Sequence, residues 1–281
     1  MPRYFNTEGL CNPALHYMVR LDDRIKKIKQ LFVDRGKYFV INRGRQYGKT
    51  TTLRALAEYL KDEYVVISID FQMMSTGNFA DESTFVVSFI EYLEDLSYGD
   101  EAIAENIDRK AFERLVSLKE GQRIFMDRLF RALSGVCRTA KKPIVLMIDE
   151  VDSASNHQVF LDFLAMLRGY YLSRDSRPIF HSVILAGVYD IKNLKLKLRP
   201  EEEHQYNSPW NIAAAFDIHM SFSADQIEAM LKEYEADHGS GMDTGAMAEE
   251  IHSYTSGYPY LVSAICKLLD ERLQGGEPTA G

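Results

Sequence analysis

One stretch of sequence decides the fold: Tyr38-Phe39-Val40-Ile41-Asn42-Arg43-Gly44-Arg45-Gln46-Tyr47-Gly48-Lys49-Thr50-Thr51. Its first four residues are apolar and predict a buried strand. The glycines that follow predict a turn. Apolar residues at helical spacing come next, at Leu53, Leu56, Ala57 and Leu60. A strand, a glycine-bearing turn and a helix in this order are typical of an α/β fold with a parallel sheet.

The turn matches the pattern G-x-x-x-x-G-K-[ST], which forms a phosphate-binding loop between a strand and a helix. Gly48, Lys49 and Thr50 match its end, whereas Arg43 stands at the first glycine position and Gly44 follows one residue later. In such a loop the backbone N–H groups and the helix N-terminus attract an anion. Lys49 then reaches the β- and γ-phosphates, and the Thr50 hydroxyl binds Mg²⁺. A glycine turn followed by a chance Lys-Thr pair is the alternative.

A second motif, Ile144-Val145-Leu146-Met147-Ile148-Asp149-Glu150, ends an apolar strand in two carboxylates. A buried carboxylate costs free energy unless it is paired, solvated or bound to a metal. Because ligands of open parallel sheets bind at the carboxyl ends of strands, we expect Asp149 to be the second Mg²⁺ anchor. Glu150 is expected to orient and polarise an attacking water. A solvent-facing pair of charges is the alternative.

Together the two motifs predict a site for ATP or ADP with Mg²⁺. The predicted catalytic residues are Lys49 and Glu150, and the predicted metal ligands are Thr50 and Asp149. The predicted nucleotide contacts run along the loop: Gly44, Arg45, Gln46, Tyr47, Gly48, Lys49, Thr50 and Thr51.

The rest of the chain alternates short β-branched runs with amphipathic stretches, which predicts further strands and crossover helices. Strands are expected at residues 64–69, 144–148 and 183–186, with a short strand at 216–220 closing the sheet. Helices are expected around 85–96, 122–139 and 160–171, a polar surface at 98–110 and a long loop at 192–211.

From Ser223 the pattern is purely helical, and Ser223 with Gln226 forms a capping box. Helices are predicted at 227–234, at 244–254 and from Pro259 onward. We therefore predict two domains, a P-loop core at 1–222 and a small all-helical lid at 223–281.

Several segments resemble one known group of proteins: Leu15 to Val19, Tyr38 to Arg43, Arg45 to Thr51, Val183 to Asp190, Asn207 to Ile212 and Gly257 to Tyr260. With the Asp-Glu motif, they resemble the P-loop ATPases with an extra catalytic glutamate, the AAA+ or ASCE type. More narrowly, they are similar to bacterial AAA-ATPase-like families related to STAND signalling ATPases. The resemblance covers nearly the whole chain and implies hydrolysis of ATP to ADP and phosphate.

The resemblance also implies roles outside the two motifs. Gly257 and Pro259 match the G-x-P motif of the STAND lid, which lies near the nucleotide, whereas the residues alone fit a helix-starting turn equally well. Residues 17–19 would approach the adenine, with simple packing as the alternative. Residues 187–190 take the place of a γ-phosphate sensor but lack a clear Asn or Thr. Arginines that could act across a subunit boundary, or be ordinary surface residues, are Arg174, Arg177 and Arg199.

Composition excludes several classes of protein. The 281 residues are 46% apolar and 26% charged, with a net charge of −8, the balance of a soluble globular protein rather than a disordered tail or a rod. No apolar run approaches the ~20 residues of a membrane span. The N-terminus lacks a signal-peptide pattern, so the expected compartment is the cytoplasm. Three distant cysteines, Cys11, Cys137 and Cys266, predict neither a disulfide framework nor a zinc site.

These observations predict an ATPase with slow Mg-dependent hydrolysis. Closure of residues 223–274 over the nucleotide would convert its phosphate state into domain geometry and so act as a conformational switch. The alternative is a nucleotide-dependent interaction or signalling module that does not hydrolyse ATP. Family analogy adds a link to DNA processing or defence, although the acidic charge disfavours nucleic acid. An unidentified protein partner and a homo-oligomer are both compatible with the sequence.

Overall fold

The computed structural model describes residues 2–120, 123–188 and 210–275. The chain packs as two compact units, and each unit draws on separate stretches of sequence. The sheet unit comprises residues 27–43 and 53–216, and the helical unit comprises residues 1–26, 44–52 and 217–281. These units are defined by packing and do not test the predicted domain boundary at residue 222, which stays a prediction.

A four-stranded parallel sheet in the order β3-β6-β5-β4 organises the sheet unit. Its strands are β3 (Tyr38–Asn42), β4 (Val65–Asp70), β5 (Ile144–Asp149) and β6 (Ser182–Gly187). Four of the five predicted strands are therefore confirmed, with slightly different bounds. Every residue of β5 and β6 is buried, as expected for strands that are covered on both faces.

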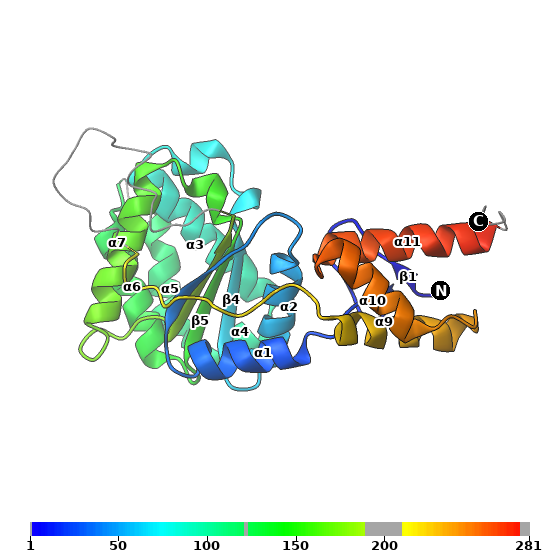
Figure 1. Ribbon diagram of the computed structural model, residues 1–281. Coiled ribbons are helices and arrows are strands. Elements are labelled where there is room, and N and C mark those ends of the chain that lie inside the picture. The colour runs from blue at the N-terminus through cyan, green and yellow to red at the C-terminus, as the bar shows by residue number, and fades with distance from the viewer. Residues whose placement is uncertain (1, 121–122, 189–209, 276–281) are drawn as a thin grey trace. The chain divides into compact units, whose positions relative to one another are not determined.

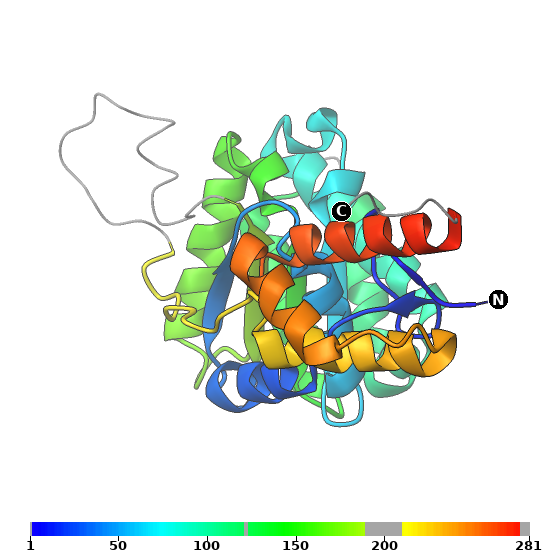
Figure 2. The ribbon, with the colours of Figure 1, turned by 45° about the vertical axis from the view of Figure 1, so that its right-hand side comes forward.

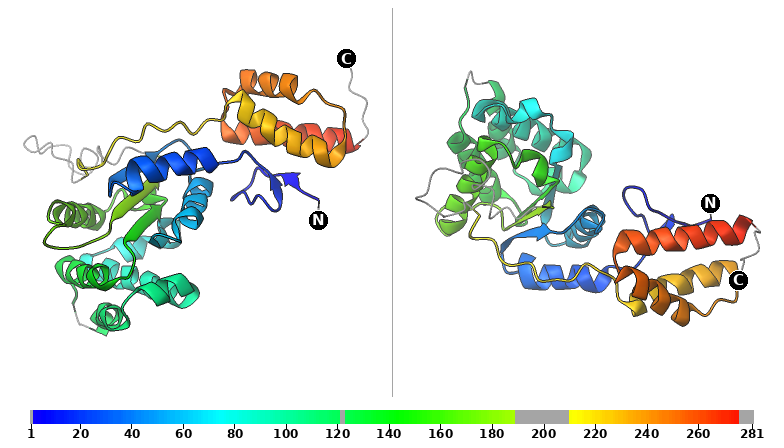
Figure 3. Two further views of the ribbon diagram at one scale, coloured as in Figure 1. Left: turned by 90° about the horizontal axis from the view of Figure 1, so that it is seen from below. Right: turned by 45° about the horizontal axis from the view of Figure 1, so that its top comes forward.

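Helices cover both faces of this sheet (Figure 1, Figure 3). On one face lie α3 (Glu82–Gly99), α6 (Met126–Thr139) and α7 (Gln158–Leu172), and on the other lies α2 (Lys49–Leu60). The ring of Phe163 in α7 contacts Phe89 of α3 and Phe130 of α6, with centroid distances of 5.3 and 5.6 Å. The aromatic packing holds α3, α6 and α7 as one layer.

Shorter elements complete the sheet unit. They are α1 (Asp22–Ile28), η1 (Lys29–Val33), η2 (Phe71–Met73), η3 (Thr76–Phe79), α4 (Glu101–Asn106), α5 (Arg109–Val116), η4 (Ser117–Glu120) and η5 (Val151–Ala154). The polar stretch predicted at 98–110 is thus partly helical, and its Ile103 and Ile107 are buried. Charged neighbours hid these two apolar anchors in the sequence pattern.

The predicted strand at 216–220 is wrong. The outer edge of β3 instead carries a single bridge, from Phe39 to Ala214. The side chains of Phe216 and Met220 are buried, but their carbonyls accept hydrogen bonds from arginines, Arg43 at 3.3 Å and Arg24 at 2.8 Å. Guanidinium donors therefore take the place of a neighbouring strand.

The helical unit contains α9 (Ala224–His238), α10 (Thr244–Thr255) and α11 (Pro259–Gly275), as predicted. A parallel strand pair, β1 (Tyr4–Phe5) and β2 (His16–Tyr17), belongs to it as well, and Figure 2 shows the N-terminal strands beside the helices. Their shared core consists of Phe5, Tyr17, Val19, Ile227, Met230, Leu231, Tyr234, Ala248, Ile251, Val262 and Cys266. The N-terminal residues thus pack with the C-terminal helices.

Within residues 2–120, 123–188 and 210–275, no helix is long and apolar enough to span a bilayer.

Candidate functional site

The loop between β3 and α2 holds two left-handed residues, Gln46 with φ of 60° and Gly48 with φ of 72°. A Cβ added to Gly48 would meet nothing within 4 Å, so glycine serves the backbone conformation there rather than space. The same conformation costs a non-glycine residue such as Gln46 about 1–2 kcal/mol. Strain of this kind collects at ligand-binding loops.

Lys49 begins α2, and its side chain is buried with only 6% exposed. Its ammonium donates a hydrogen bond to the Gly44 carbonyl oxygen at 3.1 Å, so the side chain folds back along the loop. A cation at a helix N-terminus meets the positive end of the helix dipole. An anion bound in the loop would offset both charges. The next residue, Thr50, is exposed in the first turn of α2.

The acid pair ends β5 in a sharp turn. Asp149 is only 7% exposed, and its carboxylate accepts the Glu150 backbone N–H at 2.9 Å. Glu150 is left-handed, with φ of 50° and ψ of 41°, and is partly exposed. Its carbonyl accepts the Ser153 hydroxyl at 2.8 Å, which secures the turn into η5. A buried carboxylate and a strained, accessible one therefore stand side by side.

The end of β6 packs against this turn. A Cβ at Gly187 would lie 2.9 Å from Cγ2 of Val151, so a larger residue would displace η5. The Asp152 carboxylate accepts the backbone N–H of Val188. Neither Asp152 nor this use of Gly187 was predicted from the sequence, because both depend on the strand order. The remaining predicted sensor positions, Tyr189 and Asp190, lie outside the described residues.

The two motifs follow strands of one sheet. The phosphate loop follows β3, and the acid pair stands at the end of β5, with Asp149 as its last residue and Glu150 next. Strand β6 lies between β3 and β5. All three strands are parallel, so their carboxyl ends lie at the same edge, where ligands of such sheets bind.

The G-x-P segment contacts the phosphate loop within the helical unit. The Tyr258 hydroxyl donates a hydrogen bond to the Arg45 carbonyl oxygen at 2.7 Å, and its ring centroid lies 4.7 Å from that of Tyr47. Burial raises the pKa of Tyr258, so the hydroxyl keeps its proton at neutral pH. Pro259 is the first residue of α11, as the helix-start interpretation has it.

Other predicted residues have structural partners. Tyr17 and Val19 are buried in the helical core, and the Tyr17 hydroxyl donates to Asp237 at 2.7 Å, which fits the packing alternative. Arg174 donates to the Gly36 carbonyl at 2.7 Å. Arg177 lines a surface groove with Arg131 and Arg138, and Arg199 lies outside the described residues.

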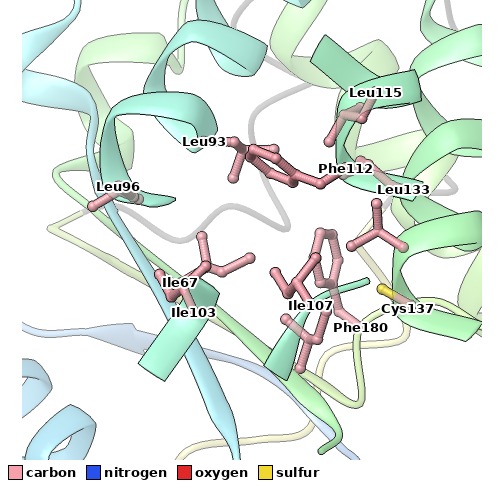
Figure 4. A pocket seen from close by; sticks show the side chains of 12 residues that line it. Ile67, Leu93, Leu96, Ile103, Ile107, Phe112, Leu115, Leu133, Cys137 and Phe180 are labelled. Atoms are coloured by element: carbon pink, nitrogen blue, oxygen red, sulfur yellow. The ribbon is translucent and has the colours of Figure 1, made fainter. Parts of the chain in front are cut away.

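A small void between α3, α5, α6 and the sheet is not a ligand site. It holds about 10 Å³ and is lined by apolar side chains and Cys137 (Figure 4). Burial raises the pKa of Cys137 to about 12, so its thiol stays protonated and inert. Within the described part of the chain, no group of three or more His, Cys, Asp or Glu side chains could hold a metal ion.

Comparison with models of known protein families identifies one matching family. Residues 14–274 match the AAA-like domain. The chain belongs to this AAA-like family. The AAA-like chain is 25% identical over 249 residues to an uncharacterized WD repeat-containing protein of Synechocystis sp., a match that covers 86% of this chain. It spans only 19% of that relative's length.

Solved structures share the fold of this AAA-like chain. The Walker-type ATPase of Pyrococcus abyssi is 14% identical, with a TM-score of 0.64 over 97% of this chain and 72% of that one. The Aeropyrum pernix ORC2 protein, solved as ADPNP-ADP complexes, is 13% identical, with a TM-score of 0.50 over 99% and 68%. The family is thus the AAA-like domain and the fold is the one seen in the Walker-type ATPase. Membership of the STAND-related families stays a prediction.

Proposed function

We propose that this AAA-like chain binds ATP with Mg²⁺ and hydrolyses it to ADP and phosphate. One observation carries the proposal: a strained loop with a buried lysine follows β3, and a buried Asp beside a strained Glu stands at the end of β5 in the same parallel sheet. The shared sheet supports the proposal, because ligands of parallel sheets bind at the carboxyl ends of their strands.

The residues divide the work by their chemistry. Lys49 and the backbone N–H groups of the loop bind the β- and γ-phosphates. Thr50 and Asp149 hold Mg²⁺, because hydroxyl and carboxylate oxygens are the hard ligands that this ion prefers. When bound, the ion neutralises charge on the phosphate oxygens. Glu150 accepts a proton from the attacking water and orients it.

Phosphate release tests the hydrolysis. Glu150→Gln should lower the rate about 10²-fold or more, the usual contribution of a general base, while nucleotide binding persists. Lys49→Ala should weaken nucleotide binding itself. Lys61→Ala is the matched control, because Lys61 lies just beyond α2 and pairs with Glu58. Equal rates of phosphate release from the parent and Glu150→Gln would contradict the proposal.

One observation favours a second candidate, a switch that binds nucleotide and does not turn it over. The described residues at the end of β6, Gly187 and Val188, offer no polar side chain to sense a γ-phosphate. Tight nucleotide binding with equal, near-zero phosphate release from the parent and Glu150→Gln would support this candidate.

In either case we propose that the phosphate state of the bound nucleotide changes the conformation of the helical unit. Such a switch requires ATP and ADP to bind its two conformations with different affinities. The contact between Tyr258 and the loop supports this idea, because it links the phosphate loop to α11.

A further inference from the structure

The hydroxyl of Tyr258 forms a hydrogen bond with the backbone of the loop between β3 and α2. It donates to the carbonyl of the peptide that joins Arg45 to Gln46. No peptide bond in the described chain is cis, so this carbonyl and the Gln46 N–H point in opposite directions. A bond that fixes the carbonyl therefore also fixes the direction of an N–H in the phosphate loop.

This peptide precedes the strained residue of the loop. Gln46 adopts φ of 60°, a conformation that its backbone would leave if nothing held it. The ring of Tyr258 also packs against the ring of Tyr47, on the far side of Gln46. Tyr258 thus holds the loop on both sides of Gln46, once by a hydrogen bond and once by an aromatic contact.

Tyr258 itself is held firmly. The preceding residue, Gly257, pairs its carbonyl with the Phe222 N–H at 2.8 Å, so close that a Cβ on Gly257 would lie 1.9 Å from the Phe222 oxygen. The following residue begins α11. The Arg24 guanidinium donates to the Met220 carbonyl and lies 5.6 Å from the centroid of the Phe222 ring. The backbone that presents Tyr258 is therefore fixed on both sides.

We propose that Tyr258 is a positioning residue that holds the Arg45–Gln46 peptide in the orientation that binds phosphate. The proposal rests on the proposed function, because it assumes that the loop binds a polyphosphate. Coupling between sites is reciprocal, so a polyphosphate in the loop strengthens the contact between Tyr258 and the loop by the same factor.

Affinity for ADP and for inorganic pyrophosphate, measured by calorimetry, tests the proposal. Tyr258→Phe keeps the ring and loses the hydroxyl, so both ligands should bind about two- to tenfold more weakly, the usual worth of one hydrogen bond. Tyr258→Leu also loses the ring contact and should bind more weakly still. Tyr254→Phe is the matched control, since Tyr254 is an exposed tyrosine of the same unit.

A kinetic readout separates positioning from a general loss of stability. In Tyr258→Phe, KM for ATP should rise while kcat at saturating ATP stays at the parent value. Tyr47→Leu probes the same contact from the loop side and should weaken pyrophosphate binding in the same direction. This second variant keeps the test decisive if a change at Tyr258 impairs folding.

The two levels of the proposal fail in different ways. If the parent binds neither ADP nor pyrophosphate, the proposed function falls. If the parent binds both, Lys49→Ala weakens them and Tyr258→Phe equals the parent, only the role of Tyr258 is overturned. Loss of affinity in Tyr254→Phe as large as in Tyr258→Phe would overturn it as well.

Discussion

At the scale of single residues, Gly257 and Gly239 offer a controlled pair. Both are left-handed, with φ of 71° and 61°, but an added Cβ would overlap the Phe222 backbone at Gly257 and meet nothing within 4 Å at Gly239. Gly257→Ala should therefore lower the free energy of unfolding by about 2–5 kcal/mol, and Gly239→Ala by about 1–2 kcal/mol. Chemical denaturation measures both, and equal losses would contradict the close approach of Phe222.

A second residue-scale prediction concerns pH. Burial lowers the pKa of His181, whose Nε2 lies 2.8 Å from the Val33 carbonyl oxygen. The unfolded chain, with a histidine pKa of about 6.5, then binds more protons than the folded chain, so stability falls as pH drops through that value. His181→Gln keeps a donor for the Val33 carbonyl but does not titrate in this range, so its stability should fall less as the pH drops. Thermal midpoints from pH 8 to 5 measure it, and an unchanged slope would refute the role of His181.

At the scale of elements, the sequence predicted features whose partners are close in sequence and missed those whose partners are far away. The capping box of Ser223 and Gln226 forms as predicted, because its partners are three residues apart. The predicted strand at 216–220 fails, because Arg24 and Arg43, far away in sequence, bond its carbonyls. The side chains of Phe216 and Met220 are buried, but the hydrogen-bond donors to their carbonyls are arginine side chains rather than a neighbouring strand.

The cap gives an element-scale prediction. Ser223→Ala removes the side-chain acceptor of the Gln226 N–H and should destabilise α9 by about 1 kcal/mol. Ser253→Ala is the control, since Ser253 lies inside α10, where alanine is the better helix former. Urea denaturation of both variants measures the difference, and a loss in Ser253→Ala equal to that in Ser223→Ala would show that the cap is not the cause.

At the scale of the whole molecule, each compact unit draws on several separate stretches of sequence. The helical unit combines residues 1–26 and 44–52 with residues 217–281. The fold class and the two sequence motifs, at residues 43–51 and 144–150, could be predicted because each pattern lies in neighbouring residues. The contact between Tyr258 and Arg45 joins residues 213 apart in sequence, so only the folded chain displays it.

The central claim is that the loop ahead of Lys49 holds a polyphosphate. Native mass spectrometry of the purified chain with Mg²⁺ and ATP tests it most directly. The account predicts a mass increment of one nucleotide on the parent and on Glu150→Gln, and its loss from Lys49→Ala. A parent chain that carries no nucleotide, or a Lys49→Ala chain that carries as much as the parent, would contradict the account.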